Sequence, residues 1–378
     1  MHICHVTTAH PPRDVRIFVK ECVALAEAGH QVTLLVAGKG ESVTDKGINI
    51  RIVPVTYKSR IGRMIRAPRE LARQIIALNP DVVHFHDPEF LLVSMKLKRK
   101  GFRVVYDVHE DVPRQILSKY WIPAWLRRIV ANLVEWYENS RAARLDAILA
   151  ATPFIAERFG KINPNTDFVR NFPIPAEFAS ELPQLKPDPP HLCYIGGITA
   201  IRGIREMVEA VEDHDIVLDL AGPVESSELF NELQKTEGWK RIIYHGTVSR
   251  EEVSRIMSSA MAGLVLFHPV PNHLDALPTK LFEYMLAGIP VITSDFPLWK
   301  NIIESHNCGI CVDPMNIRQI SEAIHWMINH PEEAEAMGKR AKALALKEYN
   351  WDTEKYRLLA CYDRMGADLP ENKTTASK

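Results

Sequence analysis

Short apolar runs alternate with segments of helical spacing along the first half of the chain. Each run has the length of a buried strand, and we expect strands at 2–7, 31–36, 81–85, 103–108 and 147–151. Apolar residues at helical intervals predict helices at 15–28 and 125–144. Strands that alternate with helices form parallel sheets covered on both faces. The first half therefore predicts a doubly wound α/β domain.

The same alternation begins again after residue 190. It predicts strands at 192–195, 216–221, 241–244, 263–267 and 291–293. It predicts helices at 205–212, 250–259, 278–287, 317–329 and 331–349. The segment 171–190, NFPIPAEFASELPQLKPDPP, is dense in proline and is interpreted as the connection between domains. We expect an N-terminal domain at 1–172 and a second α/β domain at 173–352.

The composition is that of an ordinary globular protein, with 46% hydrophobic and 25% charged residues in a chain of 378. No apolar run approaches the roughly 20 residues that span a bilayer, and MHICHVTTAHPP does not resemble a signal peptide. We therefore expect a cytoplasmic protein. The six scattered cysteines suggest reduced thiols. Cys308 and Cys311 form a lone CxxC without a second pair, so no metal or redox role is expected for them.

Charge is distributed unevenly between the two halves. Residues 1–172 hold 26 Lys and Arg against 17 Asp and Glu, a net +9, whereas residues 173–378 hold 20 against 30, a net −10. A basic domain beside an acidic one indicates that the basic domain faces something anionic. A membrane surface, an anionic acceptor or a nucleic acid all fit this charge.

The segment 275–290, DALPTKLFEYMLAGIP, carries the sharpest chemical signal. Pro278 suits a helix start, and Gly288 suits a helix end. Lys280 then lies in the first turn, where the helix dipole disfavours a cation unless an anion sits against the helix. Glu283, one turn later, can accept two vicinal hydroxyls of a ribose. A solvated Lys280–Glu283 pair on an ordinary helix is the competing interpretation.

Several turns follow strands at the edge of the second predicted sheet where ligands of such sheets bind. Gly196 and Gly197 allow close approach of backbone to a ligand, and Arg202 follows at a distance that can reach phosphate. Other turns after strands hold Gly222, Thr247 and Val248. Each of these turns is equally compatible with a plain connection. Two such sheets facing each other would enclose a cleft, a common location for a site.

Histidines follow three strands of the first domain. His10, His86 and His109 come after three separate strands, with Glu110 beside the last. Neutral histidine can donate to a sugar hydroxyl or polarise a leaving group. A structural role for any one of them is the alternative. Their spacing does not match a closed zinc site, so no metal is expected.

Basic and aromatic residues gather in two stretches of the first domain, 58–73 and 120–128. Such a mixture can seat an amphipathic surface at an anionic membrane. A buried helix with a solvated basic face is the alternative. A nucleic-acid partner is not expected, because no known binding signature is present.

Four motifs resemble those of glycosyltransferase family 4, the retaining enzymes of the GT-B fold. They are HDPEFL at 86–91, YDVHED at 106–111, VRNFP at 169–173 and PTKLFEYMLAGIPVI at 278–292, and the similarity covers nearly the whole chain. The first three are similar to bacterial surface-polysaccharide members. The resemblance implies two Rossmann-like domains facing across a cleft, with a final helix near 353–365 returning to the first domain in the segment 353–378.

The resemblance also implies roles for individual residues. Glu283 would grip the donor ribose, Asp275 would lie near the transferred sugar with Ala276 and Leu277 beside it, and His109 would lie beside the donor sugar. Two positions depart from the family pattern. Asp275 stands where family members have glutamate, and Gly197 stands where they have arginine, while Arg202 keeps the second phosphate-binding charge. After the first strand, His10-Pro11-Pro12 replaces the usual glycine pair.

The implied reaction is transfer of a sugar, with retention at the anomeric carbon, from a nucleoside-diphosphate sugar to a carbohydrate or lipid-linked acceptor. Arg202, Lys280 and the helix start would hold the leaving diphosphate without a divalent metal or other cofactor. The front domain could contact the inner face of an anionic membrane. A nucleotide-sugar epimerase of the same fold and a silent sugar-nucleotide-binding subunit are the alternative functions.

Overall fold

A computed structural model describes residues 1–119, 122–178 and 187–367 of the protein. The chain divides into two compact units, Met1–Asn171 with Glu354–Lys378, and Phe172–Thr353. The sequence-based boundaries were 172/173 and 352/353. In the described part of the chain, no helix is both long and apolar enough to cross a membrane.

Unit 1 is built on a sheet in the order β3-β4-β2-β1-β5-β6-β7-β8. All neighbouring strands are parallel except β3, which is antiparallel to β4. The strands are β1 His2–Thr7, β2 Gln31–Ala37, β3 Val43–Asp45, β4 Ile48–Val53, β5 Val82–Phe85, β6 Arg103–Val108, β7 Ala147–Ala150 and β8 Thr166–Phe168.

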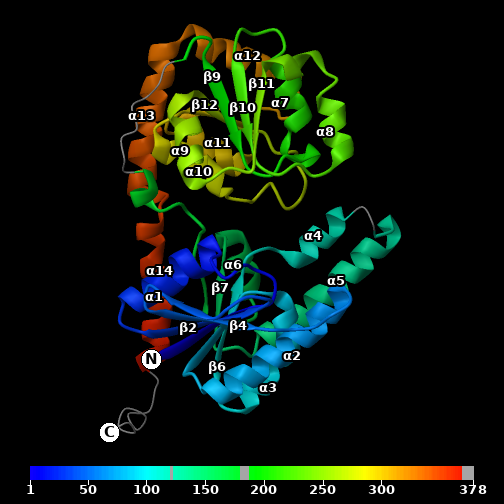
Figure 1. Cartoon of the computed structure of the whole chain (residues 1–378), viewed down its shortest axis with the longest axis vertical. Helices are drawn as coiled ribbons and strands as arrows, with labels where there is room; N and C mark the ends of the chain where they lie inside the picture. The colour runs from blue at the N-terminus through cyan, green and yellow to red at the C-terminus, as the bar shows by residue number, and fades with distance from the viewer. Residues whose placement is uncertain (120–121, 179–186, 368–378) are drawn as a thin grey trace. The chain divides into compact units, whose positions relative to one another are not determined.

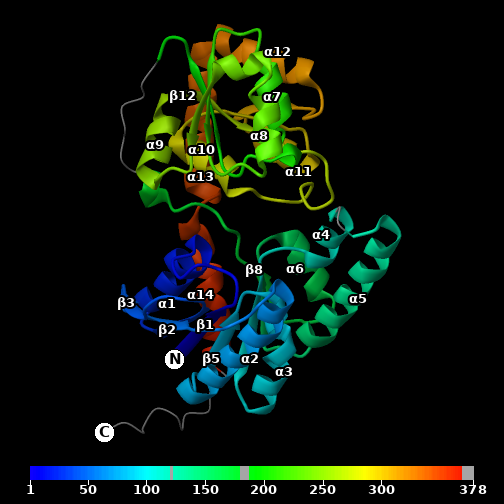
Figure 2. The same cartoon turned by 45° about the vertical axis from the view of Figure 1, so that its right-hand side comes forward.

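Helices cover both faces of this sheet (Figure 1). They are η1 Val15–Cys22, α1 Val23–Glu27, α2 Arg60–Leu78, η2 Pro88–Phe90, α3 Leu91–Arg99, α4 Val112–Ser118, α5 Ala124–Ala142, α6 Pro153–Gly160 and α14 Trp351–Ala367, which lies in unit 1 from Glu354. One face packs an apolar core against α2, α3 and α6. Figures 1 and 2 show α1 and α14 on the other face.

Alternation along β1 sends Cys4 and Val6 into the apolar core and His5 to the opposite face. His5 is the register partner of His84 on β5, so the two imidazoles are neighbours across the strands. His86 lies two residues beyond His84 and therefore shares its face. Phe85 pairs with Tyr106, which places His86 beside Asp107 of β6. The sheet register thus gathers polar side chains on one face of unit 1.

Unit 2 is built on a parallel sheet in the order β11-β10-β9-β12-β13-β14. Its strands are β9 His191–Ile195, β10 Val217–Ala221, β11 Ile242–Gly246, β12 Ala260–Val265, β13 Val291–Ser294 and β14 Gly309–Val312. Its helices are η3 Pro175–Phe178, η4 Ala200–Arg202, α7 Ile204–Ala210, α8 Ser227–Leu233, η5 Glu237–Arg241, α9 Arg250–Ser259, α10 Thr279–Ala287, α11 Pro297–Ile303, α12 Ile317–Asn329 and α13 Pro331–Glu348.

The two faces of this sheet have separate apolar cores. One core packs under α9, α10 and α13, and the other packs under α7, α8 and α12 (Figures 1 and 2). Both units are therefore doubly wound, as the alternation of strands and helices predicted. The carboxyl ends of β9, β10 and β12 lead into the loops that carry the proposed donor-binding residues.

The structure differs from the sequence-based prediction in local features. The helix expected over 15–28 begins as a π-helix, Val15–Cys22, before α1 continues. Strands β3, β4, β8 and β14 were not predicted, and β14 contains Cys311 of the CxxC. All six cysteines are free thiols. Residues 179–186 of the predicted connection at 171–190 and the polar tail after 369 lie outside the described residues.

Candidate functional site

Helix α10 begins at Thr279, one residue later than predicted, with Pro278 at its N-cap. Gly288 ends the helix at φ 79°, a left-handed conformation that glycine adopts without steric cost. Pro278 provides no side-chain cap. Lys280 is the second residue of the helix, so its side chain projects near the helix start.

The ammonium of Lys280 is buried without a hydrogen-bond partner. The residue is 8% exposed, and Nζ has no hydrogen-bond acceptor within the described residues. Nζ lies 3.8 Å from the centroid of the Tyr194 ring and 5.5 Å from that of Phe267. These ring faces compensate part of the desolvation of the cation. The remaining donor capacity is available to an anionic ligand.

The glycine loop after β9 lies directly against this lysine. A Cβ added to Gly196 would come within 2.5 Å of Lys280 Nζ, and one added to Gly197 within 2.9 Å of Arg202 Nη1. Arg202 Nη1 donates to the Gly197 carbonyl at 3.3 Å. Two cations from different elements thus meet at one glycine turn. Side chains on the turn would occupy the space next to these cations.

A third glycine holds the loop in place. Gly222, after β10, has φ 144°, and an added Cβ would approach the Gly196 carbonyl oxygen to 2.1 Å. Its N–H donates to the Gly246 carbonyl at 2.7 Å. Beyond Gly246, Thr247 is exposed and Val248 packs partly against the core under α10. The predicted strand-end residues of unit 2 therefore do gather at one edge of its sheet.

The electrostatics of this edge favour an anion. Burial lowers the pKa of the Lys280 ammonium well below its usual range, and the neighbouring Arg202 lowers it further. A bound diphosphate would reverse both effects by supplying negative charge and hydrogen-bond acceptors. The start of α10 adds the positive end of a helix dipole. The arrangement can hold a phosphate group with three independent sources of positive potential.

Glu283 lies one turn along α10 and is held by a residue that the sequence did not single out. Arg250, at the start of α9, donates from Nη1 to Glu283 Oε1 at 2.9 Å and also pairs with Glu177. The side chain of Glu283 is 13% exposed. One guanidinium shared by two carboxylates fixes the rotamer of Glu283 while leaving its other oxygen unpaired by Arg250.

The loop before α10 carries the remaining predicted donor residues. Asp275 is exposed, while Ala276 and Leu277 are partly buried. The carbonyl of Ala276 accepts a 2.7 Å hydrogen bond from Trp299 Nε1, which anchors the loop to α11. The exposed carboxylate of Asp275 is therefore next in the chain to an anchored backbone position.

In unit 1, Asp107 is the centre of the histidine-bearing edge. Arg16 donates to it from Nε at 2.9 Å and from Nη2 at 2.6 Å, and both His86 Nδ1 and His109 Nε2 lie within 3.0 Å of Oδ2. Burial alone would raise the pKa of Asp107, but Arg16 and His109 hold it well below its usual range. The ionised carboxylate thus orients the imidazole of His109.

His10 joins His109 at this edge, with ring centroids 5.1 Å apart. A hydrogen bond to Asp14 raises the pKa of His10. Asp87 supports the turn by accepting from Thr7 Oγ1 at 2.8 Å. Glu110 is exposed and accepts from Gln115.

The structure corrects the expectation for His86, which was predicted to face an acceptor. Its backbone N–H donates to the Val6 carbonyl at 3.2 Å, so the chain continues in the sheet beyond β5. The side chain is buried between His5 and Asp107, and burial lowers its pKa to about 4. His86 is thus a neutral interior imidazole.

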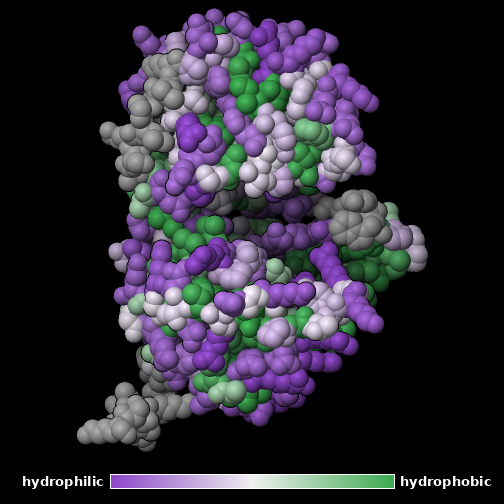
Figure 3. Space-filling model, viewed as in Figure 1, coloured by the Kyte–Doolittle hydropathy of each residue, from purple (hydrophilic) through white to green (hydrophobic). Residues whose placement is uncertain are grey.

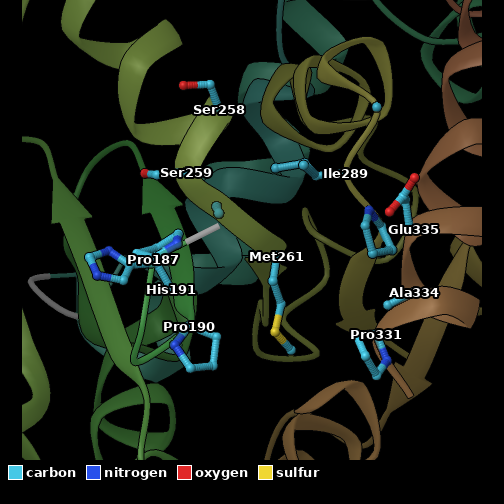
Figure 4. Close-up of a pocket in the computed structure, with 13 residues that line it drawn as sticks. Pro187, Pro190, His191, Ser258, Ser259, Met261, Ile289, Pro331, Ala334 and Glu335 are labelled. Carbon is cyan, nitrogen blue, oxygen red and sulfur yellow. The ribbon is translucent and has the colours of Figure 1, made fainter. Parts of the chain in front are cut away.

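A hollow in unit 2 lies where β9 and β12 begin (Figure 4). Residues from the starts of β9 and β12 line it, together with the segment that follows α10: His191, Ala260, Met261, Gly288, Ile289 and Pro290. Ligands of parallel sheets bind at the carboxyl ends of the strands. This hollow is therefore distinct from the candidate donor site.

Several supporting residues were missed in the sequence. Asp107 could have been found, because it precedes His109 by two residues and so shares its strand face. Tyr194 could also have been found, because it is the penultimate residue of the strand that leads into the glycine loop. Arg250 and Arg16 could not be found from the sequence. Their partners, Glu283 and Asp107, lie more than 30 residues away in the chain.

Comparison with known families agrees with this geometry. The family model described as "Glycosyltransferase Family 4" matches residues 16–170, and the one described as "Glycosyl transferases group 1" matches residues 177–344. Together they cover most of the chain. Two doubly wound units with these matches define the GT-B class of glycosyltransferases. The chain is a glycosyltransferase of the GT-B class, and its two halves are similar to the family 4 and group 1 models.

Individual relatives point the same way. The D-rhamnosyltransferase WbpZ of Pseudomonas aeruginosa is 26% identical over 71% of this chain and 69% of its own length. Sucrose-phosphate synthase from Thermosynechococcus elongatus superposes with a TM-score of 0.76 at 16% identity, covering 97% of this chain and 99% of that one. HepE from Anabaena in complex with UDP-glucose gives 0.72 at 11% identity, covering 96% and 100%. The chain is similar to the first of these proteins in sequence and to the other two in fold.

Proposed function

We propose that this glycosyltransferase transfers a sugar, with retention of anomeric configuration, from a nucleoside-diphosphate sugar to a carbohydrate or lipid-linked acceptor in cell-surface polysaccharide or glycolipid assembly. The observation that carries the proposal is the buried ammonium of Lys280, which lies at the start of α10 against the Gly196–Gly197 turn and has no hydrogen-bond partner in the described part of the chain. The name of the rhamnosyltransferase relative supports the class of reaction, and the UDP-glucose complex of HepE supports the class of donor.

Different residues of unit 2 would bind different parts of the donor. Lys280, Arg202 and the start of α10 would hold the diphosphate, and Glu283, fixed by Arg250, would accept the ribose hydroxyls. Gly196, Gly197 and Gly222 leave room for the phosphates beside the backbone. Asp275, Ala276 and Leu277 would lie toward the sugar, while Thr247 and Val248 would border the nucleoside.

Negative charge develops on the leaving diphosphate as the glycosidic bond to the donor breaks. Lys280 and Arg202 are already placed before the reaction, so they stabilise this charge without reorganisation. Two fixed cations and a helix start supply what a divalent metal supplies in other transferases. We therefore propose that donor binding and transfer require no metal ion at this site.

His109 and Glu110 of unit 1 are proposed for the acceptor side, together with His10. The contact of His109 Nε2 with Asp107 leaves its Nδ1 on the other side of the ring for a sugar hydroxyl. His86 is withdrawn from this set because it is buried.

An exposed apolar stripe in unit 1 favours an acceptor that resides at a membrane. Along α5, the exposed fractions are 73% for Trp125, 51% for Ile129, 61% for Leu133 and 70% for Trp136. Spacings of four, four and three residues put all four on one helix face. Figure 3 shows apolar side chains gathered over α5.

Exposed basic side chains lie on α5 itself and on another helix of unit 1, α2. Arg128 on α5 is exposed, as are Arg60, Arg66 and Arg69 on α2, which also exposes Ile61. Tryptophan with arginine is the composition of helices that lie in the interface of anionic bilayers. We propose that α5 rests on the inner face of such a membrane, where lipid-linked acceptors are found.

Ligand-dependent stabilisation tests the donor assignment. Thermal unfolding is measured with UDP-, GDP-, dTDP- and ADP-sugars, for the wild type and for Lys280→Ala. A ligand at 100 times its Kd stabilises the folded state by about 2.7 kcal/mol. We expect one nucleotide class to raise the melting temperature of the wild type, and to raise that of the variant much less. Equal shifts in both proteins would contradict the donor site.

A further inference from the structure

The buried face of the unit 1 sheet holds a polar cluster that the proposed transfer does not use. His5, Glu21 and His84 are 0% exposed, and His86 is 2% exposed. One nitrogen or oxygen atom from each lies within 4.8 Å of those of the other three. His5 Nδ1 lies 3.0 Å from His86 Nε2 and 4.0 Å from Glu21 Oε2, and His84 Nε2 lies 3.9 Å from the same oxygen.

The inward-facing atoms of this cluster are poorly satisfied. Both oxygens of Glu21 and Nε2 of His84 have no hydrogen-bond partner within the described residues. Arg16 Nε lies 3.1 Å from Glu21 Oε1, but its hydrogen bonds go to Asp107 and to the Val169 carbonyl. One guanidinium therefore faces two interior carboxylates. A buried carboxylate without hydrogen bonds is costly unless a cation binds it or a proton neutralises it.

The outward-facing ring nitrogens, in contrast, all have partners. His86 Nδ1 lies 3.0 Å from Asp107 Oδ2, and His84 Nδ1 lies 2.5 Å from the hydroxyl of Tyr362. His5 Nε2 lies 3.5 Å from the same hydroxyl. A metal-bound histidine characteristically uses its second nitrogen in this way, with a carboxylate or other polar group fixing the ring. The cluster thus has oriented rings around an unsatisfied centre.

We propose that His5, Glu21, His84 and His86 bind a divalent transition metal ion, Zn²⁺, in a closed structural site of unit 1. Bonds of about 2.0–2.1 Å at the tetrahedral angle place ligand atoms roughly 3.4 Å apart. Three of the six separations are 3.0, 3.9 and 4.0 Å, and the other three do not exceed 4.8 Å. Side-chain shifts that draw the four atoms toward a common centre would complete the site. The contact between His5 and His86 is replaced by two bonds to the ion. Three imidazoles and one carboxylate suit zinc better than magnesium or calcium.

The fold explains why these residues meet although their spacing in sequence does not suggest a zinc site. His5 and His84 are register partners on β1 and β5, and His86 follows on the same face. The π-helix η1 brings Glu21 to the face that it shares with Arg16, since its hydrogen bonds link residues five apart. Tyr362 arrives from α14. The ion would tie two strands and η1 directly, and α14 through Tyr362.

Metal content of the untagged full-length protein, purified from cells grown with added zinc, tests the site. We expect about one zinc ion per chain by elemental mass spectrometry. The ion should resist dialysis against a chelator under native conditions, because the ligands are buried, and should leave on denaturation. X-ray absorption at the zinc edge of the wild type should show a nitrogen- and oxygen-only shell.

Variants locate the ion. Glu21→Gln and His84→Gln should each lose most of the zinc, whereas Cys22→Ala, a change at an equally buried neighbour that offers no proposed ligand, should retain it. If the ligand variants do not fold, the absorption spectrum of the wild type still decides. A wild type without stoichiometric metal, a sulfur-containing shell, or zinc retained in both folded ligand variants would overturn the proposal. The neutral cluster would then consist of hydrogen-bonded imidazoles beside a protonated Glu21.

Discussion

The ammonium of Lys280 lies 3.8 Å from the centre of the Tyr194 ring and has no hydrogen-bond acceptor within the described residues. The aromatic face compensates only part of the cost of burying this group, because an ammonium also needs hydrogen-bond acceptors. The phosphates of a donor would supply the missing acceptors. This relationship gives the first three predictions.

Removing the ammonium of Lys280 should lower the affinity for the phosphates of the donor and leave the affinity for the nucleoside unchanged. Lys280→Ala should weaken binding of the nucleoside diphosphate by roughly 10- to 100-fold, the worth of a charge-assisted hydrogen bond of about 1.5–3 kcal/mol. Calorimetric titration with the diphosphate and with the free nucleoside measures both affinities. Glu283→Gln should instead weaken the binding of both ligands by similar factors, because both contain the ribose. Lys339→Ala, at an exposed lysine of α13, is the control. Equal losses for both ligands in Lys280→Ala would remove its phosphate role.

Diphosphate binding should be accompanied by proton uptake. Burial lowers the pKa of Lys280 in the free protein, and a bound anion raises it, so the complex holds more protons than the free state in the intervening pH range. Affinity should therefore fall as pH rises through that range. Calorimetry at a series of pH values from about pH 8 upward, where phosphate is already fully ionised, in buffers of different ionisation enthalpy measures the protons taken up. Lys280→Met should abolish the uptake. Undiminished uptake in this variant would assign the proton elsewhere.

Gly222 and Gly246, at the carboxyl ends of β10 and β11, offer a matched pair of substitutions. Gly222→Ala places a Cβ about 2.1 Å from a carbonyl oxygen, whereas Gly246→Ala meets nothing within 4 Å, although both glycines have positive φ. Gly246→Ala should cost only the conformational term of roughly 1–2 kcal/mol. Gly222→Ala should cost more and should also weaken diphosphate binding, because the Gly196 turn must move. Melting temperatures and Kd values check this. Indistinguishable variants would mean that the contact does not fix the loop.

The exposed stripe on α5 predicts membrane binding. Co-sedimentation with vesicles containing anionic lipid should recover the wild type, and high salt should weaken the interaction. Trp125→Ser with Trp136→Ser should reduce binding roughly tenfold or more, given about 1.5–3 kcal/mol for burying each large apolar side chain. Leu92→Ser with Tyr356→Ser alters two exposed apolar residues of unit 1 outside α5 and should have little effect. A wild type that stays in the supernatant would contradict the membrane assignment.

Local chemistry in the sequence predicted much of unit 2. Gly288 and Pro278 gave the ends of α10 to within one residue, and the unfavourable position of Lys280 in its first turn pointed to an anion. Such signals are carried by neighbours in the chain. The Arg250–Glu283 pair was not predictable, because it joins two helices whose relative placement depends on packing of the whole unit.

In unit 1, by contrast, the sequence predicted the strands but not the surroundings of the candidate site residues. Strand positions came from apolar runs, but the histidines that end those strands were all expected to be accessible. His86 is interior because the sheet continues one residue beyond β5 through its bond to Val6. The π-helix could not be distinguished from an α-helix by periodicity over 15–28. The burial of Glu21 and the contact of His84 with Tyr362, 278 residues away, depend on tertiary structure alone.

The reaction itself is the most direct test of the account. A nuclear magnetic resonance time course follows each nucleotide sugar that stabilises the protein, with and without acceptor, in the presence of a chelator. The account predicts release of a nucleoside diphosphate, a first-formed product of unchanged anomeric configuration, and strongly reduced turnover in Lys280→Ala. An inverted product would contradict retention. A sugar interconverted while still on its nucleotide, or tight binding without turnover, would contradict the assignment as a transferase.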